Sequence, residues 1–570
     1  MTDNFTADQQ EYLKGFMSGV EARRGSLAPA SEAATDPTDL QRQAQDRTIA
    51  GGGKLTPEED SKRRRNPLDR TDEIEKLSAE GKFPKGTDVF LTKYHGLFYV
   101  APAQDSFMCR MRMPGGILSA AQFRGVADMA DDLAGGFVDI TTRANLQIRE
   151  IPARNATEVL NRLADLGLTS KGAGADNVRN VTGSPTAGID PQELIDTRPV
   201  ARQIHHHILN HRELFGLPRK FNIAFDGGGR VPVLEDTNDI AFSAVRVGDE
   251  VLYALALGGI TGHSDFARSS GVVVPPEETT AVCDAILRVF ITHGDRTSRK
   301  TSRLKYLLDR WGHEKFIEEV EAQLGCTLRR VEDQGPRLPQ EKHGHLGIHD
   351  QKQAGLNYVG VTTAIGRLRS EQVRGLARVA ERFGSRTIRL TVWQNLLISD
   401  IPTPDLPAAL EAIAALGLGW EASAISGGLI ACTGNAGCKF AASNTKSHAA
   451  QLVEFLDPRI TVTHPINIHV TGCPNSCAQH LVGDIGLLGA RVDQGGDDTV
   501  EGYDLHVGGG AGPEQKIGRL IRPAIAFPDL PPMVLALLRA WNDAGSFQEW
   551  SAAQTDEQLA SVLNHVMEPA

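Results

Sequence analysis

The sequence predicts an α+β fold built on an internal duplication, and two observations lead to this prediction. Three segments recur at one common offset of 250 residues. They are QFRG (122–125) with QVRG (372–375), ITTRANLQIREIP (140–152) with LTVWQNLLISDIP (390–402), and YALALGGITG (253–262) with YDLHVGGGAG (503–512). Each copy also contains an alternating strand, a turn, an apolar-periodic helix and a second strand, an order typical of α+β domains. The shared offset indicates a duplicated ancestor, whereas a solenoid would need more repeats.

The duplication divides the chain into an N-terminal extension and four compact units. We expect the extension over residues 1–75, and two small strand-rich halves over 76–155 and 341–403. Two larger α+β lobes are expected over 156–340 and 404–570. A pseudo-two-fold axis between the copies would place a shared site between the lobes, where ligand pockets often lie.

The N-terminal extension is predicted to contain one short helix and a flexible connector. Residues 5–20 favour the helix, and residues 24–66 have few apolar side chains, so compact structure is expected to begin near Asp69. The charge run SKRRRNPLDR (61–70) is interpreted as the solvated end of this linker, with docking of an acidic partner as the alternative.

Composition excludes several classes of protein. The formal net charge of −11 argues against a general nucleic-acid binder, although an acidic protein can still carry a local basic patch. The sequence contains no run of eighteen apolar residues, so we predict no membrane span. It also shows no basic start followed by an apolar run, so we predict no secretory signal. With only seven cysteines, the chain is expected to work in a reducing cytoplasm.

Four of the seven cysteines form two tight pairs, CTGNAGC (432–438) and CPNSC (473–477). A disulfide is disfavoured in a reducing compartment, and the C-x5-C and C-x3-C spacings suit structural zinc less well than the usual spacings do. Cys432, Cys438, Cys473 and Cys477 also suit a 4Fe–4S cluster, whose irons each need one thiolate. Glycine, asparagine and proline around them let the backbone turn closely. Spacing alone leaves iron–sulfur and zinc both open.

Several other residues receive structural interpretations. Cys109, Cys283 and Cys326 are each expected to be small buried side chains. The run His205–His206–His207, with His211 one turn further, is expected at the surface or the core edge rather than at a metal. Trp393 stands in the second copy where Arg143 stands in the first, and we expect it to pack in the core.

Basic residues gather in the first copy beside predicted strand ends and glycine turns. They lie in CRMRMPGG, TTRANLQ, NVRN and LPRKFN, and a second set lies in DRTSRKTSRLK (295–305). Together they indicate a binding place for a polyanion. No Walker motif accompanies them, and GGGAGP (508–513) lacks the spacing of a dinucleotide fingerprint.

The cysteine signature and the duplicated frame resemble those of the sirohaem- and 4Fe–4S-containing nitrite and sulfite reductases. The resemblance covers nearly the whole chain after about residue 75, through the C-x5-C and TGCPNxC motifs. It implies two ferredoxin-like half-domains and two cofactor lobes. It also implies that the four cysteines bind one 4Fe–4S cluster and that Cys477 bridges to the sirohaem iron.

The resemblance further implies roles for the basic residues. Arg110, Arg179 and Lys220 match the family's pocket for the substrate anion. Positions that hold the carboxylates of the macrocycle are matched by Arg143, Arg219, Arg299, Arg303 and Lys305, and the predicted cofactor-binding set also includes Arg112 and Asn475.

Asn222 helps to choose the substrate. Sulfite-reducing members typically read RKFK where this chain reads RKFN, so a second pocket lysine is replaced by Asn222. Nitrite is a monoanion and needs less positive charge than sulfite, so we expect six-electron reduction of nitrite to ammonium. Sulfite reduction is the first alternative, and a non-catalytic iron–sulfur sensor or structural zinc protein is the second.

The electron donor is expected to be a separate protein. The chain has no flavin or nicotinamide fingerprint and no further cysteine pairs for a second cluster. A ferredoxin or similar small acidic protein is the donor that the resemblance implies. We expect a monomer, because the internal duplication already supplies the two-fold symmetry that many proteins obtain by dimerising.

Overall fold

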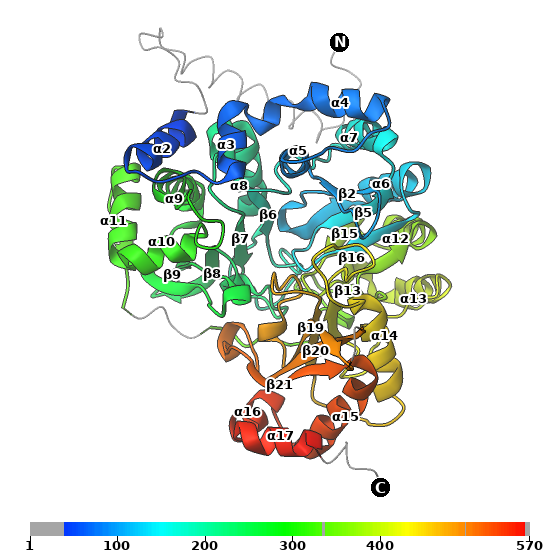
Figure 1. Ribbon diagram of the computed structural model, residues 1–570. Helices are drawn as coiled ribbons and strands as arrows, with labels where there is room; N and C mark the ends of the chain where they lie inside the picture. Colours follow the sequence, from blue (N-terminus) through cyan, green and yellow to red (C-terminus); the bar gives the residue numbers. More distant parts are fainter. Residues whose placement is uncertain (1–38, 333–336, 496–497, 565–570) are drawn as a thin grey trace.

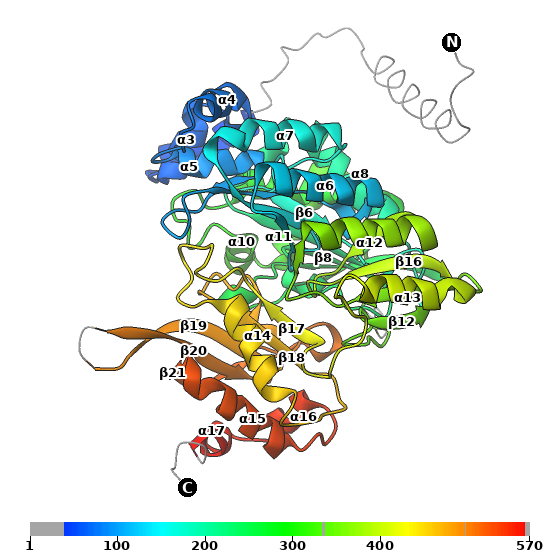
Figure 2. The ribbon, with the colours of Figure 1, turned by 90° about the vertical axis from the view of Figure 1, so that its right-hand side faces the viewer.

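The computed structural model describes residues 39–332, 337–495 and 498–564, which form four β-sheets flanked by helices (Figures 1 and 2). Two five-stranded sheets belong to the duplicated half-domains, and a six-stranded and a five-stranded sheet form the centres of the two lobes. This arrangement confirms the predicted α+β class with internal duplication. No helix in the described ranges is long and apolar enough to cross a membrane.

The sheet of each half-domain includes one strand from the other copy. The first sheet has the order β1 (Leu97–Tyr99), β2 (Phe107–Arg110), β5 (Leu146–Ile151), β4 (Phe137–Ile140) and β14 (Arg367–Arg369). The second has the order β12 (Gly347–Asp350), β13 (Leu356–Val361), β16 (Leu396–Pro402), β15 (Thr387–Leu390) and β3 (Ile117–Ser119). Since β14 pairs with β4 and β3 pairs with β15, the two half-domains share one hydrophobic core.

The helices of the half-domains show why the sequence folds this way locally. Helix α6 (Ala120–Leu133) begins at a capping box formed by Ser119 and Gln122, and its apolar residues at helical spacing face the shared core. Helix α12 (Ser370–Phe383) is its counterpart, and the two lie side by side (Figure 2). They cover the same side of the two interlocked sheets, next to α7 (Ala156–Asp165) and α13 (Leu406–Ala414).

The two lobes share one topology. The first sheet has the order β11 (Arg329–Arg330), β10 (Arg268–Val274), β9 (Glu250–Leu257), β8 (Ile240–Val247), β7 (Phe221–Asp226) and β6 (Val178–Thr182). The second has the order β17 (Gly428–Ala431), β18 (Asn467–Thr471), β19 (Ile485–Asp493), β20 (Thr499–Val507) and β21 (Arg519–Ala526). In both sheets the first three strands along the chain are parallel and the following ones are antiparallel. The shared topology extends the duplication to the lobes.

Helices pack on both lobe sheets and give each lobe its own core. The first lobe carries α8 (Arg198–Asn210), α9 (Thr279–His293), α10 (Leu304–Trp311) and α11 (His313–Leu324). The second carries α14 (Thr445–Leu456), α15 (Leu530–Trp541), α16 (Phe547–Ala552) and α17 (Asp556–Asn564). The lobes meet where Gly262 of the first packs against Pro474, Asn475 and Ser476 of the second.

The predicted flexible connector is wrong from residue 39 onward. Residues 39–79 form α2 (Asp39–Ala50), α3 (Pro57–Arg64) and α4 (Thr71–Ala79), and α2 and α3 cover the first lobe (Figure 1). The predicted helix over 5–20 lies outside the described residues. The hydrophobic pattern of the sequence did not predict these helices, because several of their buried residues are polar. Gln45, Glu59 and Lys62 are each less than 4% exposed and are paired inside the protein. The interpretation of 61–70 as solvated linker is therefore wrong for Lys62.

The remaining structural expectations have mixed outcomes. Cys109 and Cys283 are buried, as predicted, but Cys326 is exposed, so its predicted burial is wrong. Cys326 lies directly after Gly325, the residue that caps the C-terminal end of α11. Trp393 is 3% exposed and packs in the shared core, as predicted. His207 lies at a core edge and pairs with Asp284 at 2.8 Å.

Candidate functional site

The two cysteine loops meet because they leave neighbouring parallel strands at the same end. Cys432 follows β17, and the 473–477 loop follows β18, which is hydrogen-bonded to β17. The carboxyl ends of parallel strands lie at one edge of a sheet, where binding loops collect. Two segments 41 residues apart are thereby brought to one place, with Cys477 exposed and Cys473 buried.

Backbone and amide N–H groups point at the sulfur atoms of this cluster of cysteines. The Gly472 N–H donates to Cys432 Sγ at 3.2 Å, and Asn475 Nδ2 donates to Cys473 Sγ at 3.5 Å. Gly434 has a φ of 70° and its Cα lies so close to Thr445 that a Cβ would meet the Thr445 nitrogen at 2.6 Å. Such N–H groups stabilise thiolate ligands and tune iron–sulfur centres.

The thiols are electrostatically coupled to one another. Burial, followed by the neighbouring Cys477, raises the pKa of Cys432 to about 11. The pKa of Cys473 is raised by burial and by Cys477 and Cys438. Among the described residues, no three His, Cys, Asp or Glu side chains converge tightly enough to share one metal ion. Four electrostatically coupled thiols in two neighbouring loops suit a 4Fe–4S cluster, whose irons each need one thiolate.

Four predicted cations interact electrostatically with the Cys477 thiol. Arg110 ends β2, Arg143 lies in the β4–β5 loop, Arg179 lies on β6 and Lys220 directly precedes β7. Burial lowers the pKa of Arg110 and Arg143 to about 10, that of Arg179 to about 9, and that of Lys220 well below its usual range. The charge of Cys477 opposes this fall in all four. Their positive charges therefore converge on the thiol that the resemblance assigns to the haem bridge.

Within the described ranges, none of these four side chains forms an ion pair with a carboxylate, and we call them the unpaired cations. Arg143 Nη1 donates to Asn238 Oδ1 at 2.8 Å, and the Arg179 guanidinium donates to the Ala175 carbonyl of its own segment at 3.1 Å. Arg110 lies over the Phe98 ring, with its guanidinium carbon 4.8 Å from the centroid. All four are half-buried rather than enclosed. Half-buried cations without carboxylates fit an anionic ligand.

A second group, the paired cations, consists of Arg219, Arg299 and Arg303. Arg299 donates to both oxygens of Asp176 at 2.9 and 2.8 Å, and Arg303 does the same to Asp239. Arg219 lies 3.8 Å from Asp176. These cations adjoin the unpaired ones, because Arg219 and Arg303 act on the pKa of Lys220.

The other predicted site residues take different places. Arg112 does not join the group, since its buried guanidinium donates to the Val178 carbonyl and to His205 Nδ1. Lys305 forms ion pairs with Asp265 and Asp309 at 3.0 and 2.5 Å. Asn222 is half-buried on β7, and its backbone N–H donates to Asp239 Oδ2 at 2.9 Å.

Three residues that the sequence analysis missed also belong to this region. Lys93 is half-buried and shares the Phe98 ring with Arg110; burial and then Arg179 and Lys439 lower its pKa to about 8. Arg149 of β5 donates to Thr433 Oγ1 at 2.8 Å and to the Gly437 carbonyl at 3.2 Å, so it supports the first cysteine loop. Lys439 follows Cys438 directly, and this position next to a predicted cluster ligand was the one feature of the sequence that could have indicated a site residue.

Comparison with family models gives matches in both copies. The model described as "Nitrite and sulphite reductase 4Fe-4S domain" matches residues 174–328 and 427–558. The model described as "Nitrite/Sulfite reductase ferredoxin-like half domain" matches residues 100–166 and 349–416. Each model thus matches once in each copy of the duplication.

Similar proteins have also been characterised in other organisms. The chain is 37% identical to the ferredoxin–nitrite reductase of Synechococcus elongatus, over 78% of this chain and 88% of the relative. It is 34% identical to the chloroplastic ferredoxin–nitrite reductase of Zea mays, over 82% and 84% of the two chains. Among solved structures, the NirA protein of Mycobacterium tuberculosis matches with a TM-score of 0.83 and 30% identity, covering 90% of this chain and 99% of NirA.

Proposed function

Because the chain belongs to the nitrite and sulfite reductase family, whose members bind sirohaem and a 4Fe–4S cluster, we propose that it reduces nitrite to ammonium with electrons from a ferredoxin. The observation that carries this proposal is the group of unpaired cations around Cys477. Relatives 34–38% identical over most of the chain are named ferredoxin–nitrite reductases, which supports the choice of substrate and donor.

The residues present fit both cofactors. The cluster would be held by the four cysteine thiolates, Cys432, Cys438, Cys473 and Cys477. Two of these sulfur atoms accept the hydrogen bonds from N–H groups described above. The paired cations would face the carboxylates of the macrocycle, together with Arg143. When bound, the two cofactors supply the electron transfer and the metal centre at which nitrite is reduced. The balanced reaction is NO2⁻ + 6 e⁻ + 8 H⁺ → NH4⁺ + 2 H2O.

The protein contributes charge and protons to this reaction. Arg110, Arg179 and Lys220 would neutralise the bound anion and stabilise the negative charge that develops on its oxygens. Burial, followed by the charges of Arg303 and Arg179, holds the pKa of Lys220 well below its usual range, which favours proton donation from its Nζ. The arginines keep their protons at neutral pH, so their N–H groups would hold ordered water that carries protons to the site.

Asn222 is proposed to favour nitrite over sulfite. It lies two residues after Lys220 on the strand that borders the unpaired cations, and its amide can donate a hydrogen bond without adding charge. The monoanion nitrite carries one negative charge fewer than sulfite, so the dianion would gain more than nitrite from a lysine here.

Electrons are proposed to enter through the first cysteine loop. Lys439 and Phe440 follow Cys438 directly, both are exposed, and Phe440 is 61% exposed. A basic side chain beside an exposed aromatic ring suits contact with a small acidic donor such as a ferredoxin. Both cysteine loops and all the cations come from one chain, so we also propose that the enzyme acts as a monomer. Its seven free cysteines suit a reducing compartment, and we propose the cytoplasm as its location.

A turnover assay tests the proposed function. Purified protein should show the Soret and red visible bands of sirohaem, and reduced methyl viologen should drive its conversion of nitrite to ammonium. Replacing Asn222 by lysine should raise kcat/KM for sulfite relative to nitrite by roughly fivefold or more, since one added charge is worth about 1 kcal/mol or more here. A clear preference of the wild-type enzyme for sulfite would contradict the proposal, and a colourless protein would exclude the whole class.

A further inference from the structure

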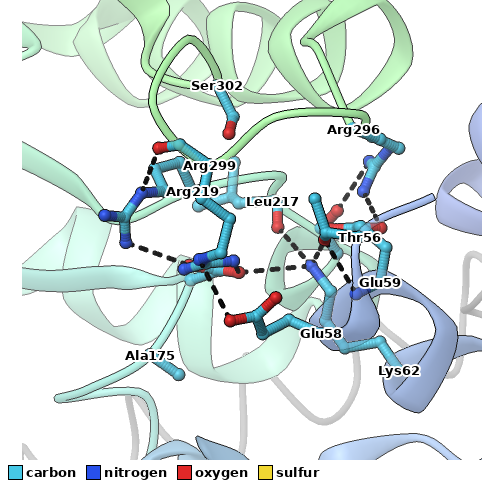
Figure 3. Close-up of polar contacts among 12 residues, drawn as sticks. Thr56, Glu58, Glu59, Lys62, Ala175, Leu217, Arg219, Arg296, Arg299 and Ser302 are labelled. Carbon is cyan, nitrogen blue, oxygen red and sulfur yellow. Dashed lines mark hydrogen bonds and ion pairs between the residues drawn. The ribbon is translucent and has the colours of Figure 1, made fainter. Parts of the chain in front are cut away.

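Helix α3 enters the site from a part of the chain that neither family model covers. The matched ranges begin at residue 100, whereas α3 spans Pro57–Arg64. Figure 3 shows Glu58, Glu59 and Lys62 of this helix in polar contact with residues of the first lobe. The inference below concerns this contact, and it rests on the proposed function because it names how this helix serves the anionic cofactor.

Asp176 is the centre of the contact. Its carboxylate has no exposure to solvent, and it lies three residues before Arg179 in the chain. Arg299 holds both of its oxygens at 2.9 and 2.8 Å, Arg219 approaches to 3.8 Å, and Lys62 Nζ to 3.5 Å. One negative charge is therefore shared by three cations.

Lys62 is anchored firmly enough to act as a fixed charge. Its side chain has no exposure to solvent, and its Nζ donates to the Leu217 carbonyl at 3.0 Å and contacts Glu59. Glu59 in turn holds Arg296 at 2.7 Å, and the Thr56 N–H that precedes α3 donates to the Arg296 carbonyl at 3.1 Å. Leu217 lies two residues before Arg219, so Lys62 supports the same segment that presents Arg219 and Lys220.

Glu58 acts in the opposite sense from the same helix. Its carboxylate lies 3.4 Å from Arg299 Nε and is 26% exposed. The whole network contains the cations Lys62, Arg219, Arg296 and Arg299 and the anions Glu58, Glu59 and Asp176. Its formal charge is therefore +4 − 3 = +1, and this excess depends on Lys62.

We propose that Lys62 is a positioning residue for the anionic cofactor: it balances part of the charge of Asp176, so that Arg219 and Arg299 together keep positive charge to attract the carboxylates of the macrocycle. Without Lys62, Asp176 would be balanced by these two arginines alone, and the network would have no net charge. Arg219, which now lies 3.8 Å from Asp176, would then be drawn closer to it, and the two arginines would attract a polycarboxylate ligand less strongly.

The experiment compares cofactor retention in four variants of the full holoenzyme. Lys62→Met removes the charge, Lys62→Arg keeps it, Glu58→Gln removes the opposing charge, and Arg64→Met is a matched control on the exposed face of the same helix. Sirohaem per chain is measured by extraction and absorbance, and its loss from the holoenzyme is followed at the Soret band. Thermal unfolding and separate kcat and KM values for nitrite are recorded alongside.

Lys62→Met should lose sirohaem about 10-fold faster than the wild type, the size usual for residues that support cofactor ligands. Lys62→Arg should restore retention, Arg64→Met should not change it, and Glu58→Gln should slow the loss by roughly two- to fivefold, as expected for a partly exposed charge. A folded Lys62→Met enzyme with wild-type retention would overturn the proposal. If Lys62→Met does not fold, the Glu58→Gln variant decides: loss of sirohaem that is faster than in the wild type would overturn the proposal.

Failure of the proposed function would look different. A wild-type protein without sirohaem would refute the cofactor assignment itself. A wild-type protein that holds sirohaem but does not reduce nitrite would leave the role of Lys62 intact, because retention is measured without turnover.

Discussion

The two copies of the duplication keep one frame but use it for different purposes. In the first, Gln122 Nε2 donates to the Leu166 carbonyl at 3.1 Å, and in the second, Gln372 Nε2 donates to the Leu416 carbonyl at 3.2 Å. In the lobes, the backbone N–H groups of Asn222 and Asn467 donate to Asp239 and Asp484 at 2.9 and 2.7 Å. Hydrogen bonds that hold the frame are thus repeated almost atom for atom.

The copies differ at the positions that face the site. Arg143 of the first copy is half-buried and acts beside Cys477, whereas Trp393 at the same position of the second is buried. Trp393 stacks on His345 with ring centroids 5.5 Å apart and donates to the Pro232 carbonyl at 3.0 Å. The second copy has filled this position with aromatic packing and supplies the cysteine loops instead. One chain therefore contains one site, made by two unequal copies.

The largest effect is expected at the residue where the two copies meet. Cys477→Ser should lower viologen-driven nitrite reduction by more than about 100-fold, because even residues that only support metal ligands typically cost 10- to 100-fold. Electron paramagnetic resonance and the visible spectrum should show a lost or uncoupled cluster. Cys326→Ser, at an exposed cysteine far from the loops in sequence, should leave both unchanged. A fully active Cys477→Ser enzyme would show that the ligand is misassigned.

The next largest loss of nitrite reduction is expected when one of the unpaired cations in the first copy is removed. Lys220→Met should reduce kcat/KM for nitrite by about 10²- to 10³-fold, the usual cost of removing one preorganised group that stabilises developing charge. Lys82→Met, whose side chain is 68% exposed, serves as the control for loss of a lysine. A change of less than threefold would mean that Lys220 is not at the reacting anion.

Lys93 should make the first copy sensitive to pH. Its pKa of about 8 means that it is charged below pH 8 and loses its proton as the pH rises, while Arg110 and Arg179, with pKa values of about 10 and 9, are still largely charged. Nitrite affinity should therefore fall above pH 8. Lys93→Arg keeps the charge, so the fall should move to higher pH. An unchanged pH profile in Lys93→Arg would assign the fall to Lys220 or another group.

The smallest effect is expected at the packed position of the second copy. Trp393→Phe removes the hydrogen bond to the Pro232 carbonyl and part of the packing, so the free energy of unfolding should drop by about 1–3 kcal/mol. Nitrite turnover at 25 °C should stay near the wild-type value. Denaturant unfolding of the holoenzyme measures the first quantity. A large loss of kcat with unchanged stability would give Trp393 a functional role that packing does not explain.

Much of the site could be predicted from local patterns. The four cysteines, their glycine-rich turns and the basic residues at strand ends are short-range features of the sequence, and the 250-residue offset revealed the frame. The charge of Cys477 acts on the pKa of Arg110, Arg179 and Lys220, which supports their predicted grouping; their roles stay predictions. Lys93 and Arg149 were missed because nothing near them in the sequence distinguishes them from solvated surface charges.

The sequence by itself determined the duplication, and it predicted the cluster ligands and an anion site, because each depends on residue identity and spacing within a short segment. Only the tertiary structure decided which cations remain free for a ligand. Arg299 shares Asp176, 123 residues away, with Lys62 and Arg219, Arg112 donates to His205, and Lys62 is buried by contacts with Asp176 and Leu217. Such pairings between distant segments leave no periodic signal, since the folded chain alone brings the partners together.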